Sequence, residues 1–337
     1  MLKKILLVIL LLLSLVVIIY HELIFYGIAQ GYGQMRIVLG AKPIEEVLVS
    51  KEFPDSLNQK LLLIKEIKQY TVDSLGLKPS ENYSKVYNQH GKALLYVLTA
   101  CEAYSFTAKE WSFPIVGEVS YKGFFNKAKG EKEEQKLIAA GYDTDLGPTG
   151  GWSTLGWFKD PVLSNMLYKR RGHLAELIIH ELTHGTIYIK SSVAFNENLA
   201  QFVGVEGAKR FLIAKYGPES KEYTNYIHDL DDEKRFTRHV FSGYKVLDSL
   251  YKNISNLSAA EKADKKKNCI VRIIKDIDTV AFYNPARYKR RLQYSQVNNT
   301  YFMEFKRYEE KQDLFSDELR LKFNGNLRSF VKSMTTQ

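Results

Sequence analysis

Residues 173–204 read HLAELIIHELTHGTIYIKSSVAFNENLAQFVG, and they place two histidines, His180 and His184, four positions apart. The apolar residues before them favour a buried helix. On a helix, side chains at i and i+4 lie on one face a turn apart, so both imidazoles can reach one zinc ion at about 2.0–2.1 Å. Glu181 lies about 100° around the helix, beside the metal, where a base for an activated water belongs. The alternative is a core helix that happens to contain histidines.

A catalytic zinc site has three protein ligands and one water, so a third ligand is expected downstream. Glu197, in NENLA, stands at the start of a second helix-like run and is the main candidate. His228 and His239 are alternatives. His173 is a further alternative, but it lies two helical turns before His180, which puts it outside ligand reach. The sequence therefore favours a site with two histidines and one glutamate.

The N-terminus carries a different signal. Lys3 and Lys4 precede an almost uninterrupted apolar run over residues 5–19. A positive segment followed by such a run is typical of a secretory signal or a signal anchor. No strong cleavage site follows the run, so we expect an uncleaved transmembrane helix over residues 1–28. The alternatives are a cleaved signal, which would give a secreted protein, and a buried core helix.

The expected anchor also decides the expected compartment. Because the lysines precede the apolar run, the positive-inside rule keeps that end in the cytoplasm. The chain would then be a single-pass cell-membrane protein with the rest of it on the periplasmic or extracellular side. Export argues against nucleic acid as a partner, although the net charge is +10. Basic runs such as residues 262–267 are expected to be solvated surface instead.

The part of the chain after the anchor, residues 29–337, is predicted to form one catalytic domain of α+β class that is mostly helical. Helical periodicity dominates and includes residues 93–108, whereas WSFPIVGEVSYKGFF at 111–125 favours short strands and turns. No repeat or linker divides the chain. The two cysteines, Cys101 and Cys269, are too few for a cysteine metal cluster, and one bridge between them could form in an oxidising compartment.

Several segments together resemble one bacterial aminopeptidase family of zincin-like metalloproteins. The resemblance spans most of the chain after residue 42, and its segments are PIEEVL (43–48), ACEAYSF (100–106), KEWSFPIVGEVSYKGFF (109–125), GWSTLGWFKDPVLSNML (151–167), LAELIIHELTHGTIYIK (174–190), FNENLAQFVGVEGAKRFL (195–212) and NNTYFMEFKRY (298–308). It implies a zincin-like zinc peptidase domain that acts on peptides. In that domain His180, His184 and Glu197 would bind zinc, and Glu181 would be the catalytic base.

Other roles are open to several residues. An oxyanion needs a hydrogen-bond donor, for which Tyr308 is the candidate and Tyr301 the alternative. An aminopeptidase also needs a carboxylate for the α-amine of its substrate, and Glu102, Glu110 and Glu118 lie in the matching segments.

The segment at residues 152–158, WSTLGWF, has two readings: a strand that pairs with an extended peptide, or plain core sheet. Three classes of function remain at this stage. The first is a membrane-anchored zinc peptidase, with aminopeptidase as the favoured mode. The second is a catalytically silent zinc-binding envelope protein that binds peptides. The third is a basic scaffold at the membrane surface that holds no metal.

Overall fold

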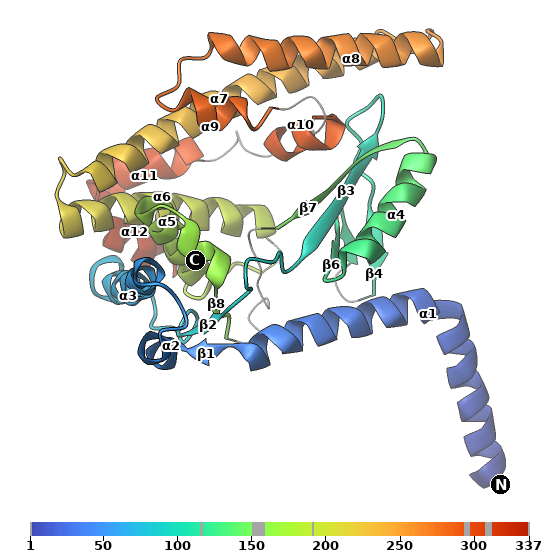
Figure 1. Ribbon diagram of the computed structural model, residues 1–337, viewed down its shortest axis with the longest axis horizontal. Helices are drawn as coiled ribbons and strands as arrows, with labels where there is room; N and C mark the ends of the chain where they lie inside the picture. The colour runs from blue at the N-terminus through green and yellow to red at the C-terminus, as the bar shows by residue number, and fades with distance from the viewer. Residues whose placement is uncertain are drawn as a thin grey trace.

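The computed structural model describes residues 2–114, 117–149, 159–190, 192–292, 297–306 and 312–335. Most of these residues are helical (Figure 1). The α-helices are α1 (Leu2–Gly40), α2 (Ile44–Ser50), α3 (Asp55–Tyr70), α4 (Lys127–Ala139), α5 (Arg171–His184), α6 (Val193–Tyr216), α7 (Lys221–Lys252), α8 (Ala259–Asp276), α9 (Pro285–Lys289), α10 (Asn299–Lys306), α11 (Gln312–Phe323) and α12 (Leu327–Met334).

The strands of the described residues form three small sheets. Their bounds are β1 (Lys42–Pro43), β2 (Lys85–Tyr87), β3 (Tyr96–Glu102), β4 (Trp111–Phe113), β5 (Gly117–Val119), β6 (Lys122–Phe124), β7 (Tyr142–Pro148) and β8 (Val162–Leu163). The strand orders are β1-β2-β8, β6-β3-β7 and β4-β5. β2 and β8 are parallel, with Val86 opposite Val162, and a short 3₁₀ turn (Ser164–Tyr168) leads from β8 into α5. The first sheet therefore fixes where α5 begins.

The main core surrounds α5. Leu174, Ile178 and Ile179 are fully buried on this helix, and they belong to one apolar cluster with residues of α3, α6 and α12. Gly204 of α6 lies where this helix crosses α5. A Cβ atom there would lie 3.0 Å from the carbonyl oxygen of Glu176 and 3.2 Å from the Cβ atom of His180. The absence of a side chain lets the two backbones approach.

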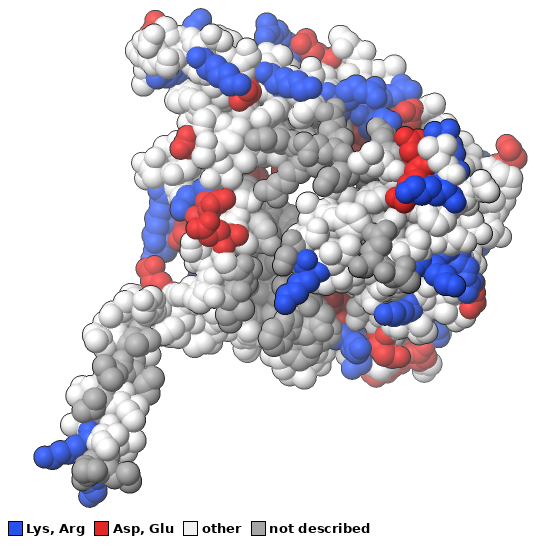
Figure 2. Space-filling model, turned by 180° about the vertical axis from the view of Figure 1, so that it is seen from behind, with Lys and Arg blue, Asp and Glu red and all other residues white. Residues whose placement is uncertain are grey.

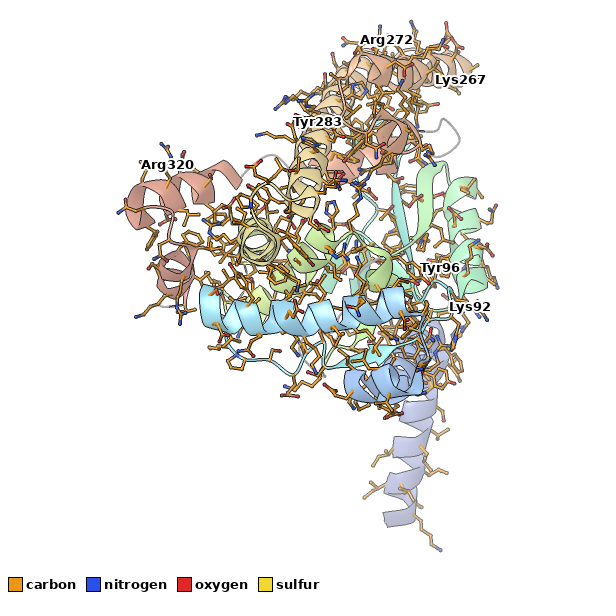
Figure 3. All side chains as sticks on the ribbon, turned by 60° about the vertical axis from the view of Figure 1, so that its left-hand side comes forward. Lys92, Tyr96, Lys267, Arg272, Tyr283 and Arg320 are labelled. Atoms are coloured by element: carbon orange, nitrogen blue, oxygen red, sulfur yellow. The ribbon has the colours of Figure 1, made fainter. Side chains whose placement is uncertain are left out.

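A second apolar cluster lies between α7, α8 and α10, which group together at the top of Figure 1. α8 begins with a capping box, in which Ser258 and Glu261 each bind the other's backbone N–H. Lysine and arginine side chains gather along α8 (Figure 2), and the exposed Lys267 and Arg272 are labelled in Figure 3. Lys266 instead forms a largely buried ion pair with Asp143 of β7. This contact joins α8 to the β6-β3-β7 sheet.

The prediction of a transmembrane anchor over residues 1–28 is wrong. None of the helices in the described part of the chain is both long enough and apolar enough to cross a membrane. α1 continues to Gly40 with a kink at Tyr20, and the side chains of Tyr26 and Gln30 donate hydrogen bonds to the carbonyl oxygen of Gly123. The error came from extending the apolar run, which ends at residue 19, into a helical segment that packs on protein.

Two related predictions fail with the anchor. The single-pass cell-membrane location and the membrane contact through the N-terminal helix both depended on it. Separately, residues 93–108 are not a helix, because residues 96–102 (YVLTACE) form β3 and pair with β6 and β7. Cys101 and Cys269 are both buried and do not form a disulfide with each other, and Cys101 Sγ donates a hydrogen bond to the carbonyl oxygen of Ser105 at 3.2 Å.

The close crossing of α5 and α6 predicts an unusual response to alanine. Replacing glycine by alanine inside a helix ordinarily stabilises by about 1 kcal/mol. For Gly204→Ala we expect a net loss of about 1–3 kcal/mol in the free energy of unfolding, because the added methyl group collides with the backbone of α5. Gly31→Ala is the matched control, since nothing lies within 4 Å of a Cβ atom at that helical position. If urea denaturation shows the same increase in the free energy of unfolding for Gly204→Ala and Gly31→Ala, the close crossing of the two helices does not constrain position 204.

Candidate metal centre

The two histidines of the HELTH segment lie at the end of α5. Burial of the apolar side chains fixes the rotation of the helix about its axis, and His180 and His184 then occupy half-buried positions one turn apart. Their Nε2 atoms lie 3.2 Å from each other, and the rings meet edge to face with centroids 4.9 Å apart. Two nitrogen atoms this close can face the same small ion.

Glu197 approaches the histidines from the first turns of α6. One of its carboxylate oxygens lies 3.5 Å from His180 Nε2, and the other lies 3.5 Å from His184 Nε2. The neighbouring Asn196 is buried, and its side-chain amide binds both the N–H and the carbonyl oxygen of Ile189, at 2.9 and 2.8 Å. This brace fastens the loop between α5 and α6, so that Glu197 faces back toward α5. Asn196 belongs to the NENLA motif of the sequence, but sequence reasoning did not predict its hydrogen bonds to Ile189.

The three side chains fit a zinc ion by geometry and by chemistry. Donor atoms about 2.0–2.1 Å from a tetrahedral ion lie about 3.3 Å from one another. Here the two Nε2 atoms lie 3.2 Å apart, and each lies 3.5 Å from a different oxygen of the Glu197 carboxylate. Two imidazoles and one carboxylate are also a common ligand set of catalytic zinc sites. In the part of the chain that the structure describes, His180, His184 and Glu197 are the group that could hold a metal ion.

The charges of this group are strongly coupled in the metal-free protein. Hydrogen bonds from His180 and His184 hold the pKa of the Glu197 carboxyl well below its usual range. Burial alone would lower the pKa of His180, but the hydrogen bond to Glu197 and the nearby Glu181 charge outweigh burial and raise it. The two carboxylates therefore favour the imidazolium form of His180.

The pKa of the Glu181 carboxyl is shifted in the opposite direction from that of Glu197. Burial raises the pKa of Glu181, and the charges of Glu197 and Asp160 raise it further, although both histidines act in the opposite direction. A general base works best when its pKa approaches the operating pH. The raised pKa suits Glu181 for proton transfer, whereas the lowered pKa suits Glu197 for holding a cation.

The other histidines have other partners. His173 lies between two carboxylates, 3.3 Å from Glu176 and 3.1 Å from Asp229. His228 stacks on Tyr283, which is labelled in Figure 3, with the ring centroids 3.8 Å apart. The imidazole of His239 lies 2.9 Å from the carbonyl oxygen of Ile273. These contacts place the three alternative ligands outside the metal group.

Two of the predicted elements lie outside the described residues: Tyr308 and the segment at 152–158. Tyr301 packs against Phe302 and Phe305 in the apolar cluster of α7, α8 and α10, rather than with the residues around α5.

The three glutamates considered for the α-amine are all exposed and do not join the metal group. Glu102 ends β3 and accepts a hydrogen bond from Ser105 at 2.6 Å, Glu110 directly precedes β4, and Glu118 lies in β5. The structure therefore does not single out one of them for the α-amine of a substrate.

Comparison with known proteins gives one match. A family model described as "Putative aminopeptidase" matches residues 25–336, which is nearly the whole chain. The chain belongs to this family. The aminopeptidase family inferred from the sequence segments is thereby confirmed, and membership of it supports a peptidase. No curated protein and no solved structure matches the chain.

The interaction between Glu197 and His180 predicts that Glu197→Gln destabilises the metal-free protein most within a limited range of pH. Glu197, with its lowered pKa, contributes stability above the unfolded value of 4.5 and loses it as pH falls. His180, with its raised pKa, contributes stability below the unfolded value of 6.5 and loses it as pH rises through the folded value. The variant should therefore be destabilised most between about pH 5 and 6.5.

Urea denaturation in the presence of a chelator, between about pH 3.5 and 8.5, measures this window. Glu219→Gln, at an exposed glutamate on the turn between α6 and α7, is the matched control. A difference between wild type and Glu197→Gln that stays constant from pH 5 to 8.5 would show that the carboxylate and the histidines are not coupled.

Proposed function

We propose that this member of the aminopeptidase family is a zinc-dependent peptidase that removes residues from the N-terminus of peptides. Family membership supports peptide hydrolysis, and the convergence of His180, His184 and Glu197, whose ligand atoms lie within 4.8 Å of one another, supports the zinc. The single observation that carries the proposal is that the Nε2 atoms of His180 and His184 lie 3.2 Å apart and that the Glu197 carboxylate lies 3.5 Å from each of them.

In this proposal His180, His184 and Glu197 hold the ion. When bound there, zinc would lower the pKa of a water to about 7 and polarise the scissile carbonyl. Glu181 accepts a proton from the attacking water and passes it to the leaving amine. Its burial supports this role, because a carboxylate withdrawn from solvent with a raised pKa is a stronger base than an exposed one.

The remaining roles follow from the reaction. The developing oxyanion requires a donor, and Tyr308 is proposed for it. The free α-amine of the substrate requires a negative partner, which Glu102, Glu110 or Glu118 could supply. A second function of a different class uses the same ligands: a protein that binds zinc and peptides without cleaving them. What favours the peptidase is the position of Glu181 next to a ligand, together with the family.

The two glutamates should fail differently when each is replaced by glutamine. Glu181→Gln removes proton transfer and leaves all three ligands in place. Its zinc content should stay at about one zinc ion per chain, while its rate of cleavage of a peptide with a free α-amine should fall by about 10²- to 10⁴-fold. Glu197→Gln removes a charged ligand, so both zinc content and cleavage should fall. Zinc should also raise the melting temperature of Glu181→Gln more than that of Glu197→Gln.

Metal analysis and peptide assays of the purified variants test this, with the N-acetylated peptide as the control substrate. Full activity in Glu181→Gln would defeat the mechanism. Full zinc content in Glu197→Gln would defeat the ligand assignment. Equal cleavage of the free and acetylated peptides would indicate an endopeptidase, and no cleavage by a zinc-loaded wild type would indicate the silent zinc-binding protein.

A further inference from the structure

A cavity of about 580 Å³ lies between the start of α5 and the short helix α9. Four of the described residues that line it carry a positive charge, and none of them carries a negative charge; the four are Lys169, Arg170, Arg287 and Arg290. The volume falls within the range of small-molecule sites. Neither the three metal-binding residues nor Glu181 line this cavity, so it is separate from the candidate metal centre.

Asp229 of α7 holds two of these cations in place. Arg170 Nη1 lies 3.0 and 2.8 Å from its two carboxylate oxygens, and Arg287 Nη1 lies 3.0 Å from one of them. The Asp229 side chain is only 4% exposed. Burial alone would raise the pKa of Asp229, but the hydrogen bond from Arg170 and the charge of Arg287 outweigh burial and lower it. Both guanidinium groups are therefore fixed in advance, which reduces the cost of ordering them around a ligand.

These ion pairs leave hydrogen-bond donors and positive charge available to a ligand. A guanidinium has five N–H groups, and Asp229 is contacted through only Nη1 of each arginine. In the part of the chain that the structure describes, Lys169 and Arg290 form no ion pair, and Arg290 Nε donates to the carbonyl oxygen of Ala286 at 3.1 Å. With His173 counted as neutral, four positive charges face the single negative charge of Asp229 and leave an excess of three.

An adjoining cavity extends the same positive field. It shares four lining residues with the first cavity: Tyr168, Lys169, Arg170 and His173. Lys60 lines this second cavity and donates a hydrogen bond to the carbonyl oxygen of Lys169 at 2.5 Å. Burial lowers the pKa of Lys60, and the charge of Arg171 lowers it further. The protonated Lys60 is thus destabilised by its surroundings, and a bound anion would relieve this.

The excess charge is concentrated at the cavity rather than spread along a face. The neighbouring basic side chains are paired with acidic ones: Arg171 with Glu222 at 3.3 Å, Lys289 with Asp278 at 2.6 Å and Arg291 with Glu233 at 2.7 Å. Nucleic acids and anionic membranes are bound by many cations that follow an extended surface. A compact group of cations in a cavity suits a small ligand whose negative charge is equally compact.

We propose that this cavity binds the phosphoryl group of a small molecule. A phosphate monoester carries about −1.5 to −2 charges at pH 7 and three acceptor oxygens, whereas a carboxylate carries one charge. The arginine fork matches pairs of phosphate oxygens, and lysine adds a point charge. Arg170 and Arg287 supply the fixed donors, while Lys169 and Arg290 neutralise the remaining charge. The proposal goes beyond peptide hydrolysis and does not depend on it.

Isothermal titration of the full chain with inorganic phosphate and with pyrophosphate tests this site. We expect both to bind, and pyrophosphate to bind more tightly because it carries more charge. The double variant Lys169→Gln/Arg290→Gln removes two exposed cations that hold no buried partner, so the protein should fold as the wild type does. Because hydrogen bonds to charged groups are lost, its Kd for pyrophosphate should rise by at least about 10-fold.

The matched control is the double variant Lys265→Gln/Lys267→Gln, which removes the same charge from exposed positions on α8. Figure 3 shows Lys267 well away from Tyr283, the residue before the cavity-lining Asn284. We expect no change in its Kd for pyrophosphate. Pyrophosphate should also raise the melting temperature of the wild type and of this control more than that of Lys169→Gln/Arg290→Gln, because binding stabilises only the folded state.

Four outcomes would overturn the proposal, whatever the peptidase assays show. The first is a wild type that binds neither anion. The second is equal pyrophosphate affinity in the wild type and in Lys169→Gln/Arg290→Gln, which would place the anion elsewhere, for example on a metal ion. The third is an equal loss of affinity in both double variants, which would indicate diffuse surface charge. The fourth is binding of succinate, a dicarboxylate, as tight as that of phosphate, which would show that the cavity does not select a phosphoryl group.

Discussion

The close approach of α5 and α6 is the constraint on which the metal centre depends. At Gly204 a Cβ atom would meet the backbone of α5, and at Gly207 it would lie 2.9 Å from Leu75 and 3.1 Å from Ile179. These close contacts restrict rotation of either helix about its axis and hold His180 facing Glu197. A site held in this way is preorganised, and binding does not have to supply the free energy of ordering it.

The site also depends on the electrostatic environments of its two glutamates, Glu197 and Glu181. Two glutamates stand within one coupled group, and their environments shift the pKa values in opposite directions: that of Glu197 falls and that of Glu181 rises. Opposite shifts in neighbouring carboxyl groups are a recurrent way of dividing the roles of ligand and base. Glu176 lies one helical turn before His180 on α5 and accepts a hydrogen bond from Gln201 of α6 at 2.8 Å.

The ligands could be predicted from the sequence because they depend on local geometry. His180 and His184 share a helix, so their spacing alone places them on one face, and the family resemblance added Glu197. Gln201 is also one turn from a ligand, yet nothing in the sequence shows that α6 brings it against α5. That contact depends on the tertiary crossing at Gly204.

The fold predictions failed where the same pattern of residues is compatible with two different secondary or membrane structures. The apolar residues at 5–19 fitted a membrane span, although α1 continues through Tyr26 onto the β6-β3-β7 sheet. The residues of β3 fitted a helix by periodicity. Their strand state comes from pairing with β7, whose paired residues lie between 40 (Glu102–Tyr142) and 52 (Tyr96–Pro148) positions further along the chain, and no local pattern reports such a pairing.

X-ray diffraction from crystals of the zinc-loaded protein, at energies on either side of the zinc absorption edge, tests the central claim most directly. The account predicts one anomalous peak about 2.0–2.1 Å from Nε2 of His180 and of His184 and from a carboxylate oxygen of Glu197. A peak at any other group of residues, such as His173 with Glu176 and Asp229, would contradict it. So would a protein that shows no zinc peak after loading.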